Sequence, residues 1–316
     1  MAQKEFLVGF TGFVGSNLAK NHQFSGLFNS KNIAEAFSQN PDLLVYAGIP
    51  ARKFYANQNP EEDLKIIKNA IENIQKINPK KIVLISTIDV IPDTDNFYEN
   101  DQIDESKLQP YGRNRYFLEE WVRNNIDDYL VVRLPALFGD NLKKNFIFDI
   151  IHPIPSVIES TQFAKLCLKD SNLSHYYQDN QDGFYKLVEN MSKEDEKNLL
   201  DILKKLNFTA LNFTDSRAEY QFYNLKNLWG HIDIALKNNL KLLHLATEPL
   251  SAEKIYEYIF QTKWENKLDG QPAKYNYKTL HSDLFNGKDD YIFSSDFILP
   301  DIASFVENSL EQKNEN

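Results

Sequence analysis

The chain has 316 residues, enough for one large domain with a smaller second lobe. Hydrophobic residues make up 42% and charged residues 25%, the composition of a folded globular protein. A formal net charge of -10 provides no basic face for phosphates, so we expect no nucleic-acid partner. The single cysteine, Cys167, and six scattered histidines indicate neither an internal disulfide nor a metal site.

The sequence also argues against a membrane protein. Lys4 and Glu5 lead directly into a short apolar segment, unlike a signal peptide. No apolar run approaches the roughly 20 residues that a membrane helix needs. We therefore expect no membrane association and a cytoplasmic location.

Apolar segments alternate with helix-compatible segments through the first half of the chain. The expected strands are residues 6–10, 43–47, 81–86 and 129–133, with one more near 27–30, and the expected helices are 16–21, 61–77 and 115–124. Strands that alternate with helices imply parallel pairing and right-handed crossovers. The fold class is therefore predicted to be α/β, with a doubly wound parallel sheet.

The second half of the chain has a different pattern. Residues 141–206 are polar and helix-compatible without a strand rhythm, and a helix at 222–236, a strand at 242–246 and a helix at 250–260 follow. We expect residues 1–140, with returning segments in 207–248, to form the sheet domain. Residues 141–316 would then form a smaller, mainly helical lobe that binds substrate.

A glycine motif follows the first strand and opens the first helix. It reads Gly9-Phe10-Thr11-Gly12-Phe13-Val14-Gly15. Glycines allow a tight turn and close approach of a pyrophosphate, while a helix N-terminus supplies N–H donors. The predicted dinucleotide-binding residues here are Gly9, Gly12, Phe13, Val14 and Gly15; the alternative is a structural turn without a ligand.

This motif resembles the fingerprint of the extended short-chain dehydrogenase/reductase family, the NAD-dependent epimerase/dehydratase group. The resemblance implies a Rossmann fold that binds NAD or NADP and acts on a nucleotide sugar. Residues 44–48 are similar to the family strand that passes under the cofactor, which implies contacts from Ala47 and Gly48. Residues 85–90 are similar to the strand with the catalytic hydroxyl, which implies that role for Thr87 and a cofactor contact for Ser86.

Tyr111 and Arg115 fall where the family has Tyr-x-x-x-Lys. On a helix, residues i and i+4 share a face, so the phenol and the guanidinium can lie over one pocket. A fixed cation favours phenolate, which suits a general acid/base. The resemblance implies that Arg115 also contacts the cofactor ribose, and the alternative is an exposed helical pair.

Other candidates rest on the resemblance alone. Residues 133–139 are similar to the segment beside the nicotinamide, which implies a cofactor contact from Pro135. Residues 215–217 are similar to the segment with a nucleotide-binding arginine, which implies that Arg217 contacts the substrate phosphates. Asp89 and Asn145 are further candidate substrate contacts.

The sequence departs from the family pattern in two places. Arginine replaces the lysine at Arg115, which puts proton relay and even catalysis in doubt. The region between Gly15 and Leu43 is short, and its strand ends without the carboxylate typical of NAD sites. Ser30 and Lys31 could instead receive a 2′-phosphate, a slight preference for NADP, or be ordinary surface residues.

The expected reaction is hydride transfer at a sugar carbon. Dehydration is disfavoured because Ile88 follows Thr87 and only Asp89 is acidic. A 4-ketoreductase and a 4-epimerase fit equally well, in polysaccharide or deoxysugar synthesis. The alternative is a non-catalytic dinucleotide-binding member of the family. The resemblance also implies a homodimer through helices 61–77 and 115–124.

Overall fold

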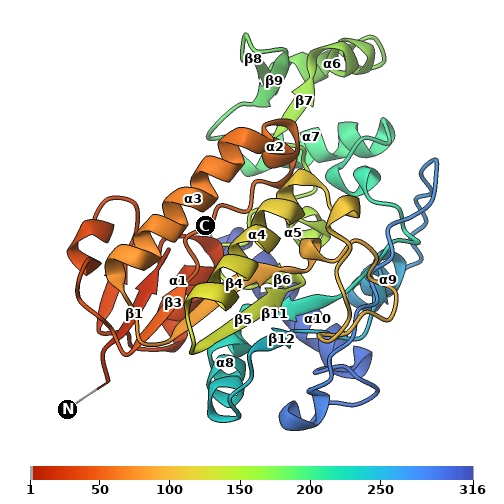
Figure 1. The fold of residues 1–316 in the computed structure, drawn as a ribbon. Helices are drawn as coiled ribbons and strands as arrows, with labels where there is room; N and C mark the ends of the chain where they lie inside the picture. The colour runs from red at the N-terminus through yellow and green to blue at the C-terminus, as the bar shows by residue number, and fades with distance from the viewer. Residues whose placement is uncertain (1–2, 316) are drawn as a thin grey trace. The chain divides into compact units, whose positions relative to one another are not determined.

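The structure is a computed structural model that describes residues 3–315 (Figure 1). Contacts divide the chain into two compact units. The first, here called the sheet unit, contains residues up to Leu142 together with Glu219–Leu250 and Lys274–Asp301. The second unit contains Lys143–Ala218, Ser251–Ala273 and the residues from Ile302 onward.

A six-stranded sheet with the order β12-β5-β4-β3-β1-β2 forms the centre of the sheet unit. Its strands are β1 (Glu5–Val8), β2 (Gly26–Phe28), β3 (Leu43–Tyr46), β4 (Ile82–Thr87), β5 (Tyr129–Leu134) and β12 (Leu242–His244). All neighbouring pairs are parallel. The chain changes direction between β1 and β3, and ligands bind at such switch points, beyond the carboxyl ends of the strands.

Both faces of this sheet are buried, which explains why its strands read as continuous apolar runs. Leu7, Val45 and Val83 point into one hydrophobic cluster with α1 (Phe13–Asn21) and α8 (Leu228–Lys237). The alternate strand residues point into a second cluster with α3 (Pro60–Ile77) and α4 (Pro110–Asn125). Each fully buried aliphatic side chain contributes about 1.5–3 kcal/mol. The prediction of a Rossmann-like, doubly wound α/β fold is confirmed.

The remaining elements of the sheet unit are short. They include the helix α2 (Lys53–Gln58), the parallel pair β6 (Ala136–Phe138) and β11 (Phe222–Asn224), and the strand β10 (Glu219–Tyr220). The helix α10 (Ser295–Glu315) begins in this unit, and β13 (Leu250–Ser251) ends at its boundary. A helix over 222–236 was therefore the wrong prediction at its start, because residues 222–224 pair with β6 as a strand.

The second unit mixes helices with a small sheet. Its helices are α5 (Phe146–Ile151), α6 (Ser160–Cys167), α7 (Lys193–Lys205) and α9 (Ala252–Phe260). The strands β7 (Val157–Glu159), β9 (Phe184–Leu187) and β8 (Tyr177–Asp179) form an antiparallel sheet in that order. These strands were not predicted, because three or four residues are too short to display a period of two.

Two further outcomes concern boundaries and membranes. The first strand ends at Val8 rather than at residue 10, because Gly9 has φ of 95° and leaves the extended region. Residues 274–301 return to the sheet unit, whereas the sequence suggested only segments within 207–248. Between residues 3 and 315, no helix is long and apolar enough to cross a membrane.

Candidate active site

The three glycines of the N-terminal motif have distinct structural positions at the switch point. Gly9 has φ of 95°, and a Cβ there would lie 2.4 Å from the carbonyl oxygen of Ala47 on the neighbouring strand end. A Cβ on Gly15 would lie 2.1 Å from the Gly9 oxygen. At Gly12, which is exposed at the N-cap of α1, a Cβ would meet only the Gly9 oxygen, at 3.3 Å. The turn thus packs tightly on the protein side and stays open at Gly12.

A cleft of about 700 Å³ lies beside this turn in the sheet unit. Its lining includes Gly12, Gly48, Ser30 and Arg52. A dinucleotide fits this arrangement, because the α1 N-terminus offers N–H groups to a pyrophosphate and the exposed Gly12 adds no side chain there. Phe13 and Val14, the first residues of α1, instead pack against the hydrophobic core.

The two predicted phosphate ligands after β2 are placed differently. Ser30 lines the cleft, whereas Lys31 is exposed and its backbone N–H donates to Asn29 Oδ1 over 2.9 Å. Arg52, which the sequence analysis did not single out, supplies a cation to the same lining. Arg52 follows β3 and Ser30 follows β2. Both strands pair with β1, which brings the two residues to the same edge of the sheet.

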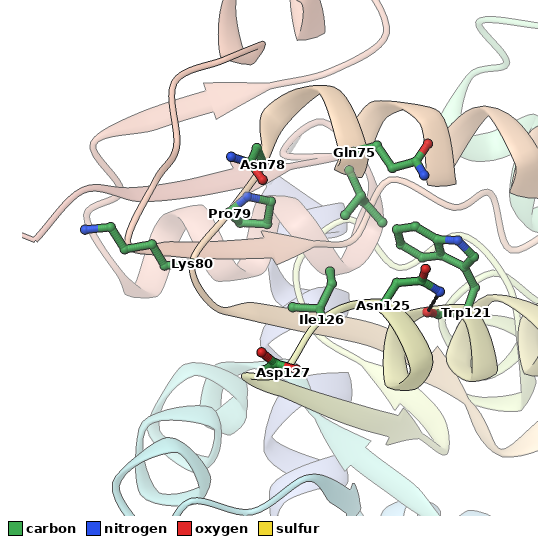
Figure 2. Close-up of a pocket in the computed structure, with 9 residues that line it drawn as sticks. Gln75, Asn78, Pro79, Lys80, Trp121, Asn125, Ile126 and Asp127 are labelled. Carbon is green, nitrogen blue, oxygen red and sulfur yellow. Dashed lines mark hydrogen bonds between the residues drawn. The ribbon is translucent and has the colours of Figure 1, made fainter.

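A second, smaller pocket of about 380 Å³ lies at the C-terminal ends of α3 and α4 (Figure 2). Trp121, Ile126 and Pro79 contribute to its wall, and Asn125 Nδ2 donates to the Trp121 carbonyl over 2.7 Å. Tyr111 lies at the opposite end of α4, and the glycine turn lines the other cleft, so this pocket is separate from the predicted chemistry.

Tyr111 sits in the first turn of α4, and its position depends on its neighbour. A Cβ on Gly112 would lie 1.9 Å from the Asp89 carbonyl oxygen, so only glycine lets α4 approach the end of β4 this closely. The Tyr111 N–H donates to Asn57 Oδ1 of α2 over 2.9 Å. Tyr111 itself is 6% exposed. The helix start is thus fixed by contacts to both the β4 end and α2.

Arg115 is buried beneath Tyr111 rather than exposed. Its Cζ lies 3.8 Å from the centre of the Tyr111 ring, a cation–π contact. Its Nη1 forms an ion pair with Asp63 of α3, and its Nη2 donates to the Pro50 carbonyl over 2.9 Å. Tyr111 and Arg115 thus contact each other as expected for residues i and i+4. The guanidinium, however, is already bonded to Asp63 and to the Pro50 carbonyl.

Burial raises the pKa of Tyr111, and the charge of Arg115 offsets only part of this effect. The carboxylates of Asp89 and Asp63 raise the same pKa further, whereas Lys53 lowers it. Tyr111 is therefore a protonated phenol at neutral pH and can act as a proton donor.

Thr87 and Asp89 meet at the end of β4. The Thr87 hydroxyl and one Asp89 carboxylate oxygen lie 3.2 Å apart, and the Asp89 backbone N–H donates to the same hydroxyl over 3.2 Å. The other carboxylate oxygen accepts a 2.5 Å hydrogen bond from Lys53 Nζ. Lys53 belongs to α2, 36 residues away in sequence. Lys53 was not predicted as a site residue, because no sequence motif marks a lone lysine outside a recognisable element.

Ser86 belongs to a buried polar row across the sheet. It lies in register with Arg133, which in turn lies in register with His244. The Ser86 hydroxyl donates to Glu119 of α4 over 2.5 Å, and Arg133 Nη2 forms a 2.7 Å ion pair with the same carboxylate. Ser86 is 8% exposed, so the structure directs it toward this network instead of the open cleft.

His244 completes the row as a neutral side chain. Burial lowers its pKa to about 4. Arg133 Nη1 lies 3.1 Å from Nε2, so Nε2 accepts and the Nδ1–H donates to the Lys278 carbonyl over 2.9 Å. This network fixes α4 and the ends of three strands relative to one another.

Of the other predicted site residues, Pro135 belongs to the sheet unit, and Asn145 and Arg217 belong to the second unit. Pro135 is half-buried directly after β5. In the second unit, Asn145 has φ of 124° and caps α5 by accepting from the Phe148 N–H over 3.1 Å. Arg217 forms a 2.6 Å ion pair with Asp215, whose pKa this arginine holds well below its usual range. Among residues 3–315, no group of three or more acidic, His or Cys side chains could hold a metal.

The contact between Gly112 and Asp89 gives a direct test. We expect Gly112→Ala to lower the free energy of unfolding by about 2–3 kcal/mol, because the new methyl group forces α4 away from β4. The matched control is Gly230→Ala in α8, where a Cβ meets nothing within 4 Å. That variant should be about 0.5–1 kcal/mol more stable than the wild type. Urea denaturation measures both, and an unchanged Gly112→Ala would contradict the close contact.

Comparisons with known proteins find one matching family and many structures of the same fold. Residues 6–156 match the family described as RmlD substrate binding domain. No curated protein sequence matches the chain. The structure resembles RMD from Pseudomonas aeruginosa complexed with NADPH, with a TM-score of 0.63, 13% identity and coverage of 98% of this chain and 100% of that one.

Two further structures are similar over nearly the whole chain. The dTDP-4-dehydrorhamnose reductase from Yersinia enterocolitica has a TM-score of 0.62 and 12% identity, with 98% of this chain and 99% of that one covered. The UDP-N-acetylglucosamine 4-epimerase from Methanobrevibacter ruminantium has a TM-score of 0.60, 12% identity and the same coverage. At such identities the structural likeness shows the fold. In sequence, residues 6–156 are similar to the RmlD substrate binding domain family.

Proposed function

We propose that this chain is an NAD(P)-dependent oxidoreductase that reduces a keto group on a nucleotide sugar. The observation that carries the proposal is the buried phenol of Tyr111, held by the Gly112–Asp89 contact beside the Thr87 end of β4. The cleft beside the glycine turn supplies room for a dinucleotide. The match of residues 6–156 to the RmlD substrate binding domain family and the structural likeness to reductases and epimerases of nucleotide sugars support this substrate class.

The residues of the sheet unit divide the work of binding and proton transfer. The backbone at Gly12 and the α1 N-terminus would hold the pyrophosphate, and Ala47 and Gly48 would line the path toward the nicotinamide. A dinucleotide held there would supply a hydride to the carbonyl carbon. Tyr111 donates its phenol proton to the carbonyl oxygen, and the Thr87 hydroxyl turns from Asp89 Oδ2 to donate a hydrogen bond to the same oxygen.

The raised pKa of Tyr111 favours reduction over epimerisation. A ketone reductase needs the protonated phenol, which burial provides. An epimerase must first remove a proton from a sugar hydroxyl, a step that begins from the phenolate that burial disfavours. We therefore infer a 4-ketoreductase, with a 4-epimerase as the second candidate of the same site.

A non-catalytic dinucleotide-binding protein is the alternative from another class. The observation that favours it is that Arg115, at the position of the family lysine, binds Asp63 and the Pro50 carbonyl. These contacts direct its N–H groups away from the ribose and the phenol oxygen. Arg217, held by Asp215 yet 40% exposed in its side chain, stays a candidate for the substrate phosphates in either case. Asn145 stays a candidate substrate contact on the second unit.

The reductase proposal predicts a specific effect of Tyr111→Phe. This variant keeps the ring over Arg115 but removes the acid, so we expect kcat for NADPH-dependent reduction of 4-keto-sugar nucleotides to fall by about 100-fold or more. Its dissociation constant for NADPH should stay within about twofold of the wild type. Stopped-flow absorbance at the nicotinamide band measures the first and fluorescence titration the second. Wild-type binding without turnover on any such substrate would favour the non-catalytic alternative.

We also propose a preference for NADP, supported by Ser30 and Arg52 in the cleft lining and by the absence of a carboxylate at residues 29–31. Arg52→Ala should weaken NADPH binding about tenfold and leave NADH binding nearly unchanged. Only NADPH carries the 2′-phosphate that the guanidinium would bind. Lys31→Ala is the matched control and should change both affinities little. Equal losses for both dinucleotides would contradict a 2′-phosphate site at Arg52.

A cytoplasmic homodimer through α3 and α4 stays a proposal. Its support is the family resemblance and the side chain of Phe117, which is 45% exposed on α4 one turn before Trp121. Phe117→Glu should convert the dimer to a monomer, because it places a charge on that face. Light scattering of the wild type and the variant measures the mass, and a wild-type mass near 36.8 kDa would refute the dimer.

A further inference from the structure

The buried Arg115 leaves one requirement of the proposed reaction unmet. After Tyr111 gives its proton to the carbonyl oxygen, the resulting phenolate needs a counter-charge and then a new proton. Arg115 stacks on the ring face, but its guanidinium is permanently charged and does not release protons. Its N–H groups are also directed to Asp63 and Pro50. Another group must therefore return the proton.

The helix α2 presents two side chains to this region. Lys53 and Asn57 are at positions i and i+4, which share one face of a helix. Asn57 Oδ1 accepts the Tyr111 backbone N–H over 2.9 Å, and Lys53 Nζ donates to Asp89 Oδ1 over 2.5 Å. The same face of α2 therefore reaches both the start of α4 and the end of β4.

Asp89 connects this lysine to the proposed catalytic hydroxyl. Its Oδ2 lies 3.2 Å from the Thr87 hydroxyl while its Oδ1 binds Lys53, and its carbonyl oxygen forms the close contact with Gly112. One residue thus joins the lysine, the threonine and the residue next to Tyr111. The ammonium group is thus held on the carboxylate whose other oxygen contacts the Thr87 hydroxyl.

The surroundings of Lys53 suit proton exchange with solvent. Its side chain is 48% exposed and that of Asp89 24%, so water reaches the ammonium while the carboxylate holds it. Burial would lower the pKa of Lys53, but Asp89 outweighs this effect and the net shift is upward, with Tyr275 and Tyr111 adding to it. The charged groups that act on Tyr111 are thus two pairs, Arg115 with Asp63 and Lys53 with Asp89.

We propose that Lys53, held by Asp89, is the cation that returns a proton to Tyr111, which Arg115 cannot do. This inference rests on the proposed reductase function. The ammonium charge stabilises the Tyr111 phenolate as it forms. An N–H bond of Lys53 then breaks as the O–H bond of Tyr111 re-forms, and the neutral amine recovers a proton from water. Lys53 acts through Tyr111 and is a positioning residue with respect to the substrate.

The charge effect can be measured without substrate or dinucleotide. Protein with all tyrosines replaced by 3-fluorotyrosine is titrated by ¹⁹F NMR, and the Tyr111 signal is the one that Tyr111→Phe removes. We expect Lys53→Met to raise the titration midpoint of Tyr111 by about one pH unit, because a nearby cation favours the phenolate. Lys53→Arg keeps the charge and should titrate within about 0.3 pH units of the wild type. Lys65→Met, which removes an exposed lysine of α3, is the matched control without a shift.

An unchanged midpoint in Lys53→Met would overturn the charge role, as would equal shifts in Lys53→Met and Lys53→Arg. Proton return is tested by kcat with 4-keto-sugar nucleotides, where both variants should lose about tenfold or more with little change in KM. Full activity of Lys53→Arg would overturn proton return by Lys53. If the wild type reduces none of these substrates, the proposed function fails, whereas the NMR titration still decides whether Lys53 acts on Tyr111.

Discussion

The arrangement of the candidate site depends on one contact between two backbones, that of Gly112 in α4 with the carbonyl oxygen of Asp89. A Cβ at residue 112 would lie 1.9 Å from this oxygen, far inside any allowed separation. Because the contact has no room for a side chain, the α4 start and the β4 end behave as one rigid piece. Tyr111 and Thr87 lie directly beside this contact in the chain, so the same constraint places both.

Two ion pairs of different character flank this rigid piece. Arg115 and Asp63 are each about 5% exposed or less, and removal of one partner from such a buried pair typically costs 3–5 kcal/mol. Lys53 and Asp89 are partly exposed, so solvent screens their attraction and their contribution to stability is small. The buried pair is therefore suited to holding α3 against α4, and the exposed pair to exchanging protons and counter-ions.

Much of this arrangement could be predicted from sequence, and the misses have physical causes. Apolar runs revealed the sheet, and the glycine spacing revealed the turn at Gly9, because both are local patterns. Local pattern also paired Tyr111 with Arg115. A local pattern could not show that the Arg115 guanidinium binds Asp63, 52 residues earlier in the chain. Nor could it show that Lys53 of α2 binds Asp89. Such partners are set by tertiary packing, which one sequence does not display.

The contacts of Arg115 explain why an arginine stands at the position of the family lysine. An ammonium at that depth would have to satisfy Asp63 and the Pro50 carbonyl with a compact group, whereas a planar guanidinium reaches both and still covers the Tyr111 ring. Arginine therefore strengthens the support beneath the phenol and removes proton exchange from that position. A reductase tolerates this division, because its phenol starts protonated and needs only one replacement proton per turnover. An epimerase needs no replacement proton, because its phenolate takes the proton of the sugar hydroxyl and returns it to the same oxygen within one cycle. A solvent-exposed proton donor such as Lys53 therefore has a function in a reductase and none in an epimerase.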